Sequence, residues 1–304
     1  LNHGGTEMGQ GLNTKVAQIV AHEFQVGFET VKITATTTGK VPNTSATAAS
    51  SGTDLNGMAA QAAARTIKGR MRAHLAELHQ CNPDSVTFTN GRVRAGAAEM
   101  SFAEAAKTCY LGRGSLSSTG FYATPKIHWD KARSRGRPFY YYAYGAAVSE
   151  VAVDLLTGEN RILRTDILHD AGRSLNPAID TGQIEGGFVQ GAGWLTTEEL
   201  VWDGDGRLRT HAPSTYKIPA CADRPPVFNV ALFEDGENIE DTIHKSKAVG
   251  EPPLMLGISV LMALSHALES VGDAYPMLDA PATPERLCLA ARRLGGPGVR
   301  LGDG

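Results

Sequence analysis

Cysteine is scarce in this chain of 304 residues, and the four cysteines lie far apart in the sequence. Cys81, Cys109, Cys221 and Cys288 form no CxxC pair, so the ligand spacings of zinc and iron–sulfur sites are absent. Four isolated thiols suit a reducing cytoplasm, where such residues serve as small buried apolar groups. We therefore expect a cytoplasmic protein in which no cysteine holds a metal ion.

An excess of basic residues and a long apolar run are also lacking. The net charge of −3 argues against a nucleic-acid partner, because a nucleic-acid binder usually carries a basic face. No apolar run reaches the roughly 18 residues that span a bilayer, so no membrane association is expected. The N-terminus has neither the basic nor the apolar part of a signal peptide, and it lacks an initiator methionine. We expect the chain to be a piece of a longer protein.

Glycine, in contrast, is abundant, with 34 residues or about 11% of the chain. The glycines cluster at 4–11, 182–193 and 250–257, between apolar segments. A linker would be rich in glycine and serine throughout, whereas clusters of this kind suggest backbone that approaches a ligand closely. None of them fits GxxxxGK[ST] or GxGxxG, so a nucleotide site of either type is not supported.

The periodicity of apolar residues predicts an α+β fold. Helices are expected at 12–24, 54–78, 101–108, 179–195, 253–268 and 281–294, and strands at 30–37, 85–88, 92–95, 139–144, 148–154, 161–169 and 227–233. Because strands and helices do not alternate regularly, we expect two similar α/β subdomains with mostly antiparallel or mixed sheets covered by helices. The basic, polar stretch at 131–137 is the softest boundary, which divides the chain into 1–130 and 131–304.

One carboxylate stands out. Glu251 lies between Gly250 and the pair Pro252-Pro253, directly before an apolar helical run. Proline has a fixed φ, pushes the preceding residue toward extended geometry and suits the first turn of a helix. A carboxylate on such a stiff turn is suited to be a general base. The alternative is an ordinary glutamate at the positive end of a helix dipole.

Three other segments are candidates for ligand contacts. The turn at 4–11 offers backbone N–H groups and the amide of Gln10, although it also fits a plain surface turn. The small residues at 48–54 could form a pocket, and capping by Thr53 or Asp54 would explain only one of them. Gln190 lies on an apolar helix, where a buried amide needs partners; it could equally be a satisfied core amide.

Six stretches, in order, resemble the molybdenum hydroxylases, the family that includes xanthine dehydrogenase and aldehyde oxidase. They read GTEMGQG at 5–11 with Thr14-Lys15, VPNTSATAAS at 41–50, SSTGFY at 117–122, SLNPAID at 174–180, STYKIP at 214–219 and KAVGEPP at 247–253. Together they cover most of the chain, which is similar to the C-terminal portion of a molybdopterin-binding large subunit of xanthine dehydrogenase type.

The resemblance implies a molybdenum–molybdopterin cofactor and a set of residues around it. By this match Glu251 is the catalytic base, and no side chain of this chain ligates the metal. The residues implied to line or hold the cofactor are Met8, Gly9, Gln10, Ala49, Ser50, Ser51, Gly52, Thr53 and Gln190.

The resemblance also implies a reaction. Glu251 takes a proton from a hydroxyl on molybdenum, and the activated oxygen attacks an electron-poor carbon of hypoxanthine or xanthine. The implied partners are the upstream half of the same subunit, iron–sulfur and FAD domains or subunits, the purine substrate and an oligomeric assembly. An aldehyde oxidase, a carbon monoxide dehydrogenase, another N-heterocycle hydroxylase and a non-catalytic assembly module stay open as alternatives, because the substrate-clamping residues of the family lie upstream.

Overall fold

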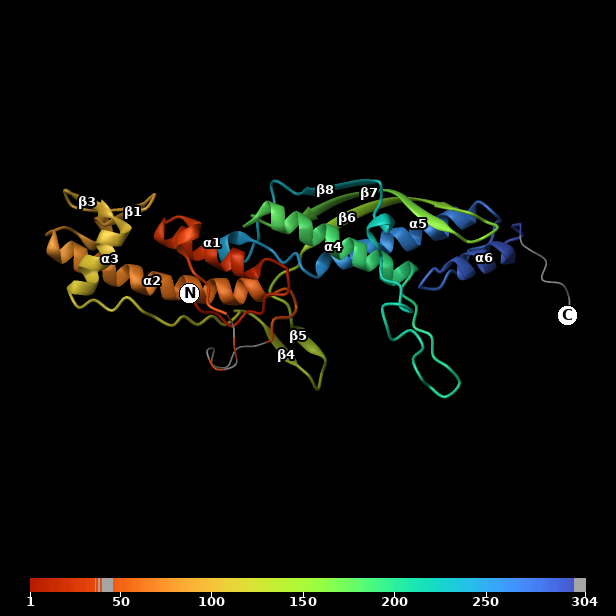
Figure 1. Ribbon diagram of the computed structural model, residues 1–304, viewed down its shortest axis with the longest axis horizontal. Coiled ribbons are helices and arrows are strands. Elements are labelled where there is room, and N and C mark those ends of the chain that lie inside the picture. Colours follow the sequence, from red (N-terminus) through yellow and green to blue (C-terminus); the bar gives the residue numbers. More distant parts are fainter. Residues whose placement is uncertain (36, 38, 40–45, 298–304) are drawn as a thin grey trace. The chain divides into compact units, whose positions relative to one another are not determined.

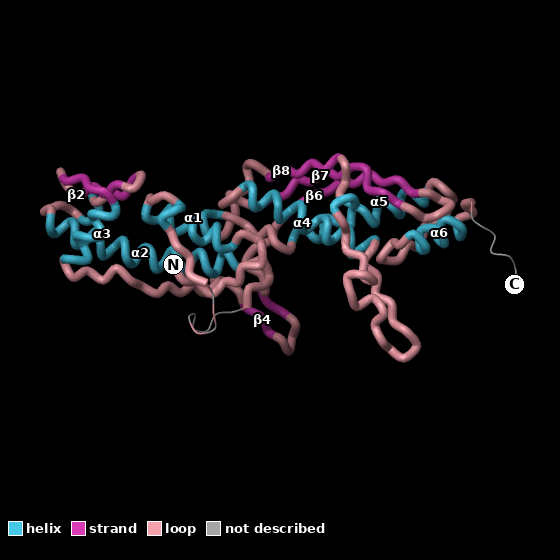
Figure 2. Tube along the Cα trace, in the orientation of Figure 1, coloured by secondary structure: helices cyan, strands magenta, loops and turns pink. Residues whose placement is uncertain are grey.

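The computed structural model describes residues 1–35, 37, 39 and 46–297, shown as a ribbon in Figure 1 and as a tube in Figure 2. The chain divides into two compact units. The first consists of Leu1–Tyr142 and Glu237–Ala248, and the second of Ala143–Gly236 and the residues from Val249 onward. The change from one unit to the other thus falls after Tyr142, and a later segment returns to the first unit.

The first unit is built on two helices and a small antiparallel sheet. Helices α1 (Leu12–Phe24) and α2 (Gly52–Leu78) pack together, and Gly57 lets them approach, because a Cβ there would lie 2.6 Å from Ile19 Cδ1. Its other elements are η1 (Phe28–Thr30), η2 (Pro83–Ser85), β1 (Thr87–Thr89), β2 (Arg92–Ala95), β3 (Ala98–Ser101), α3 (Phe102–Leu111), β4 (His128–Asp130), β5 (Arg135–Arg137) and η4 (Ile243–Lys245).

The end of α2 and the helix α3 form the main core of this unit with β1–β2–β3. Met71, Leu75, Val86 and Val93 are buried there, so the apolar face of a long helix and one face of a meander cover each other. The predicted hairpin around Asn90-Gly91 is confirmed as β1–β2, with Thr89 paired to Arg92.

The second unit is a mixed three-stranded sheet covered by helices. Strand β6 (Tyr144–Val153) pairs antiparallel with β7 (Asn160–Asp170), and β8 (Val227–Leu232) pairs parallel with the other side of β7. Figure 1 shows α4 (Pro177–Thr196) and α5 (Ile258–Glu269) along the sheet; α4 packs against β8 and α5 against β6. The unit also contains η3 (Cys221–Asp223), η5 (Pro252–Gly257) and α6 (Pro284–Arg293).

The core of the second unit lies between α4, α5, α6 and the sheet, where Ile184, Phe188, Val260, Leu264 and Leu268 are fully buried. These residues recur at helical spacing on α4 and α5, which is why each helix buries one stripe. The prediction of an α+β fold with mixed or antiparallel sheets under helices is confirmed.

Two predicted strands are wrong. The β-branched segment at 30–37 gives the 3-10 turn η1 and then extended chain outside any sheet over its described residues. The tyrosine-rich segment at 139–144 is also irregular, and β6 begins only at Tyr144. Alternation favours extended backbone, but a strand also needs a neighbouring backbone to pair with, and none of the described strands pairs with either segment.

The apolar run that begins at Pro252 also differs from its prediction. It starts as the 3-10 helix η5, in which Pro252 and Pro253 occupy the first turn where no N–H is needed, and it becomes the α-helix α5 at Ile258. Together, Pro252–Glu269 is one helical stretch whose length and mean hydropathy of 1.3 would suffice to cross a membrane, and 33% of it is buried. The expectation that no run reaches that length is therefore corrected.

Candidate functional site

Glu7 organises the glycine turn that leads into α1. Its Oε1 accepts hydrogen bonds from the N–H groups of Gly9 (2.9 Å) and Gly11 (3.0 Å), and its Oε2 accepts one from Asn13 (2.9 Å). Burial acts to raise the pKa of Glu7, but these backbone donors outweigh it and the pKa is lowered. The positive φ values of Gly9 (102°) and Gly11 (77°) let the backbone wrap around the carboxylate.

The amide of Gln10 is used within the same turn. Its Oε1 accepts a hydrogen bond from the Met8 N–H at 2.6 Å, and its Nε2 donates to the Thr6 carbonyl at 2.8 Å. The Met8 side chain is 70% exposed. An amide nitrogen has a second proton and its oxygen a second lone pair, so Gln10 shapes the turn and keeps capacity for a ligand.

A loop of small residues begins α2. Ala49 and Ser50 have left-handed φ values of 54° and 51°, a costly conformation for residues with a Cβ that tends to occur at ligand sites. Ser51 is the N-cap residue, and its side chain makes no capping bond; its Oγ donates to the Ala48 carbonyl at 3.0 Å. The alternative that Thr53 or Asp54 caps the helix is therefore wrong.

The two loops of the first unit are joined. The Thr6 N–H donates to Thr47 Oγ1 at 2.8 Å, so the glycine turn and the start of the small-residue loop lie side by side. The first turn of α2, with Gly52 and Thr53, adds backbone donors and the positive end of a 27-residue helix. The turn that carries Met8, Gly9 and Gln10 is thus tied through Thr6 to the segment that leads into the loop at 49–53.

Asp54, in the first turn of α2, carries an unusual carboxyl group. It accepts a 2.6 Å hydrogen bond from the Tyr141 hydroxyl. Burial raises the pKa of Asp54 to about 6, against the lowering effects of that hydrogen bond and of the Lys15 charge. Burial, with the nearby Asp54 charge, also raises the pKa of Tyr141.

The other two candidates belong to the second unit, on elements packed through glycines. A Cβ at Gly191 of α4 would lie 2.1 Å from the Leu254 carbonyl oxygen, and a Cβ at Gly257 would lie 2.5 Å from the Ala192 nitrogen. Only glycine permits this approach, so α4 and η5 are held in direct backbone contact. The contact reaches the start of η5 through Gly187, where a Cβ would lie 2.9 Å from Pro253 Cβ, two residues after Glu251.

Glu251 and Gln190 are both exposed. Glu251 is the N-cap residue of η5, with φ −102° and ψ −37°, so the expected extended geometry is wrong. The 3-10 turn overrides the preference of a residue before proline, since the Leu254 N–H donates to the Glu251 carbonyl at 3.0 Å. The expectation of a buried Gln190 is also wrong, because the glycine face of α4, not Gln190, meets η5.

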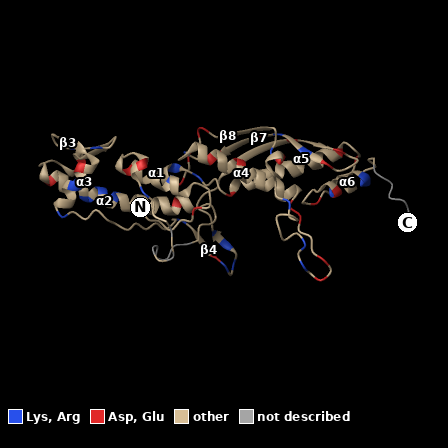
Figure 3. Cartoon of the chain, in the orientation of Figure 1, with Lys and Arg blue, Asp and Glu red and all other residues tan. Residues whose placement is uncertain are grey.

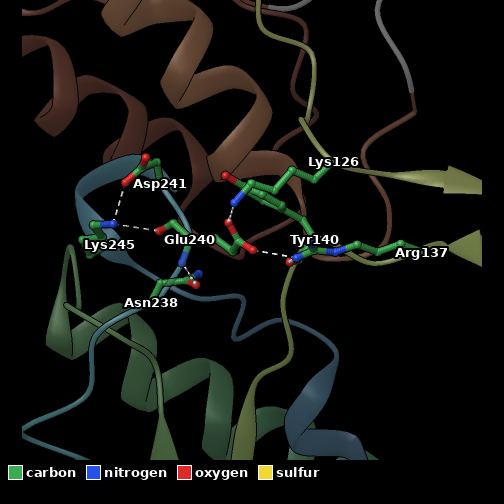
Figure 4. Close-up of polar contacts among 7 residues, drawn as sticks. All are labelled: Lys126, Arg137, Tyr140, Asn238, Glu240, Asp241 and Lys245. Atoms are coloured by element: carbon green, nitrogen blue, oxygen red, sulfur yellow. Dashed lines mark hydrogen bonds and ion pairs between the residues drawn. The ribbon is translucent and has the colours of Figure 1, made fainter.

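The sequence did not predict a third charged group, a cluster of side chains around Glu240. Glu240 is 6% exposed, and its carboxylate meets Lys126 Nζ and Arg137 Nη2, each at 2.6 Å (Figure 4). The same Arg137 nitrogen donates to the Tyr140 carbonyl at 3.0 Å. Lys126 and Arg137 lie 114 and 103 positions from Glu240 in the chain, so no local sequence pattern could have predicted the cluster. The cluster ties the returning segment 237–248 to the base of the β4–β5 hairpin.

Figure 3 shows that basic and acidic side chains are interspersed, as the small net charge suggests. Among the residues that the structure describes, no group of three or more His, Cys, Asp or Glu side chains could hold a metal ion.

A model of the molybdopterin cofactor-binding domain matches residues 1–225, and the chain belongs to this family. Its cofactor is therefore molybdenum–molybdopterin. The chain is 44% identical over 303 residues to a xanthine dehydrogenase of Oryza sativa subsp. japonica, covering 95% of this chain and 21% of that protein. It is 46% identical over 295 residues to a xanthine dehydrogenase of Dictyostelium discoideum, covering 94% and 20%. The chain thus spans about a fifth of the length of these relatives.

Solved structures share the fold of this chain. A carbon monoxide dehydrogenase from Oligotropha carboxidovorans matches with a TM-score of 0.82 and 22% identity, over 97% of this chain and 35% of that chain. Quinoline 2-oxidoreductase from Pseudomonas putida 86 matches with a TM-score of 0.80 and 23% identity, over 96% and 36%. At such identities the likeness concerns the fold alone.

Proposed function

We propose that this chain is the cofactor-holding part of a longer xanthine dehydrogenase, which hydroxylates hypoxanthine and xanthine. The observation that carries the proposal is the 44–46% identity to xanthine dehydrogenases over at least 94% of the chain. The structural likeness to the carbon monoxide and quinoline enzymes extends to the fold only, so it does not favour their substrates.

The loops of the first unit fit an anionic, heterocyclic cofactor. The N-terminus of α2 has no side-chain cap from Ser51, so its backbone donors suit a phosphate. A Cβ at Gly9 would meet nothing within 4 Å, so the space beside this backbone is open to a ligand. We propose that Met8, Gly9 and Gln10 line the pterin, and that the loop at 49–53 holds it through N–H groups and hydroxyls. Gln190 would donate a further hydrogen bond.

When bound, the cofactor supplies the redox chemistry of molybdenum. The contribution of the chain is to bind it, orient it and move one proton. We propose that Glu251 accepts that proton, because the glycine contact between α4 and η5 fixes the backbone from which this carboxylate extends. The substrate clamp, the iron–sulfur clusters and the FAD would belong to other parts of the polypeptide or to partner subunits in a cytoplasmic, oligomeric enzyme. The chain by itself would be inactive and without metal.

The test is Glu251→Gln in the complete enzyme, with turnover and molybdenum content measured together. General-base catalysis typically contributes about 10²- to 10⁴-fold, so turnover should fall by at least that range while the metal content stays near normal. Glu234→Gln, at another exposed glutamate of the same unit, is the matched control and should retain full activity. A Glu251→Gln enzyme with parental turnover would remove this residue from the base role.

A panel of substrates separates the purine assignment from its rivals. The complete enzyme should prefer hypoxanthine and xanthine over aldehydes, carbon monoxide and quinoline. A correctly matured complex that contains no molybdenum would instead identify a non-catalytic assembly module.

A further inference from the structure

An open groove runs along the second unit between β6 and α5. It encloses about 1110 Å³ and extends from Ala147 to Leu155 on the strand side and from Met255 to Ser270 on the helix side. Small-molecule sites are enclosed pockets of about 300–1,000 Å³, whereas this groove follows the length of a strand. Its shape suits a polypeptide segment.

The strand side of the groove is the edge of the sheet. Consecutive residues of β6, from 147 to 151, line it, whereas one face of a strand would supply only alternate residues. β6 pairs with β7 on one side, and no other strand within the described part of the chain pairs with its second side. From Gly145 to Val153, roughly 30 Å of strand, the backbone groups of alternate residues therefore face a side on which no described strand pairs.

The edge also lacks much of the protection that free edges usually have. From Tyr144 to Ser149 the strand carries no charged residue and no proline, and the Val148 side chain is 72% exposed. Two features of β6 oppose pairing with a further strand: the single charge of Glu150 and the irregular register between Glu150 and Val151. An exposed, uncharged edge of this kind is a template for pairing with another backbone.

The helix side is apolar where it faces the groove. Met255 is 50% exposed, Ile258 43% and Met262 54%, at spacings of three and four residues that place them on one face. Only a third of the stretch Pro252–Glu269 is buried, although its composition is that of a core helix. The hydroxyl of Ser265, which also lines the groove, is buried and has no hydrogen-bond partner among the described residues.

We propose that this groove is the docking site of an extended, uncharged segment from the remainder of the same polypeptide, which pairs with β6 as a fourth strand and covers the apolar face of α5. In relatives with 44–46% identity, the region that matches this chain is about a fifth of the length, so most of such a polypeptide lies outside the matched region. The ionisable groups along the groove include Glu150 and Glu269, which disfavour an acidic segment. Main-chain hydrogen bonds would give the affinity, and alternate apolar side chains would fill the groove.

Photo-crosslinking of the complete polypeptide tests the occupant. A photoreactive residue in place of Val148 should crosslink to a distant segment of the same molecule. In a mixture of isotopically light and heavy copies, each crosslinked pair of peptides should then be all light or all heavy. A crosslink between light and heavy copies would overturn the proposal in favour of self-association. A crosslink to another protein or to lipid, or none at all, would also overturn it. The same residue in place of Leu289, a half-exposed apolar position on α6 outside the groove, is the control.

A charge placed in the groove gives an independent measurement. Met262→Lys in the complete polypeptide would bury an unpaired ammonium under the added strand and should lower Tm by about 5 °C or more. Leu289→Lys, also on a helix and 44% exposed, should leave Tm nearly unchanged. Equal Tm values for the two variants would mean that the groove is empty. Neither variant touches Glu251, so the result stands apart from that of the base assignment.

Hydrogen exchange of the complete polypeptide shows whether β6 gains a neighbour. With a fourth strand, nearly all β6 amides should exchange as slowly as those of β7, which is paired on both sides. If about half of the β6 amides exchange at once, the edge is open and the proposal fails.

Discussion

The contact between α4 and η5 leads to a prediction whose sign depends on which glycine is replaced. Gly186 and Gly191 lie on the same helix, five residues apart. A Cβ at Gly186 would meet nothing within 4 Å, whereas a Cβ at Gly191 would lie 2.1 Å from the Leu254 carbonyl oxygen. Alanine is favoured over glycine in a helix interior by about 1 kcal/mol, so Gly186→Ala should stabilise the second unit by about that amount.

Gly191→Ala gains the same helix propensity but creates an overlap with backbone. The obstructing atom is the Leu254 carbonyl oxygen, which cannot rotate away as a flexible side chain would, so α4 and η5 must separate. Overpacking in a closely packed interior typically costs about 1–3 kcal/mol and occasionally more. Because both variants gain the same helix propensity, they should differ by the overpacking cost alone, about 1–3 kcal/mol. Gly186→Ala should lie about 1 kcal/mol above the parent protein, and Gly191→Ala should lie level with the parent or as much as about 2 kcal/mol below it.

Native-state hydrogen exchange of the α4 amides is the appropriate assay, because it reports the stability of this unit without assuming that the whole chain unfolds in one step. In the complete enzyme, Gly191→Ala should also lower turnover, since it displaces the segment that carries Glu251. Equal protection of α4 in the two variants would refute the close approach of α4 and η5.

Three further predictions concern the first unit. Hydrogen bonds to Lys126 and Arg137 lower the pKa of Glu240, so the contribution of Glu240 to folding stability is present at neutral pH and is lost as the pH falls through that pKa. The Tm of Glu240→Gln should therefore depend less on pH than the Tm of the parent protein. An equal dependence of Tm on pH in the two proteins would contradict this prediction. Because the pKa of Asp54 is raised to about 6 in the folded protein, its contribution to folding stability is complete below the unfolded pKa and is lost as the pH rises through about 6. NMR of the Asp54 carboxyl carbon should find this pKa. Tyr141→Phe removes a hydrogen bond to the charged carboxylate, so it should raise the pKa of Asp54 rather than lower it. Ser101→Ala breaks a capping box and should cost about 1 kcal/mol in denaturant unfolding, whereas Ser51→Ala, at an end without a side-chain cap, should cost clearly less; equal losses would contradict the capping geometry.

Local rules explain why much of the fold could be predicted. The helices at 12–24 and 179–195, the hairpin at 85–95 and the strand at 227–233 all lie within a few residues of the observed elements. In each case the apolar period, a turn dipeptide or a helix boundary acts over a few residues, so the signal is contained in the segment itself. The segments at 30–37 and 139–144 failed because pairing depends on a neighbour that their own residues do not specify.

The candidate site divides in the same way. The glycine turn, the small-residue loop and the proline-backed Glu251 were visible because unusual backbone needs particular residue types at particular positions. The roles of Glu7 and Asp54 were missed. Three backbone donors hold the first, and a tyrosine 87 residues away holds the second, so both depend on how the chain folds back on itself.

By itself, the sequence determined the secondary structure of the strongly periodic segments, the positions where glycine and proline constrain the backbone, and the resemblance that names the cofactor. Only the tertiary structure decided that Gly191 and Gly257 serve a backbone contact, that Glu240 is held by two distant cations, and that one edge of the second sheet lies open beside an apolar helix. The physical reason is that periodicity and turn chemistry are properties of neighbours along the chain, whereas packing, ion pairing and strand pairing join residues that the sequence keeps far apart.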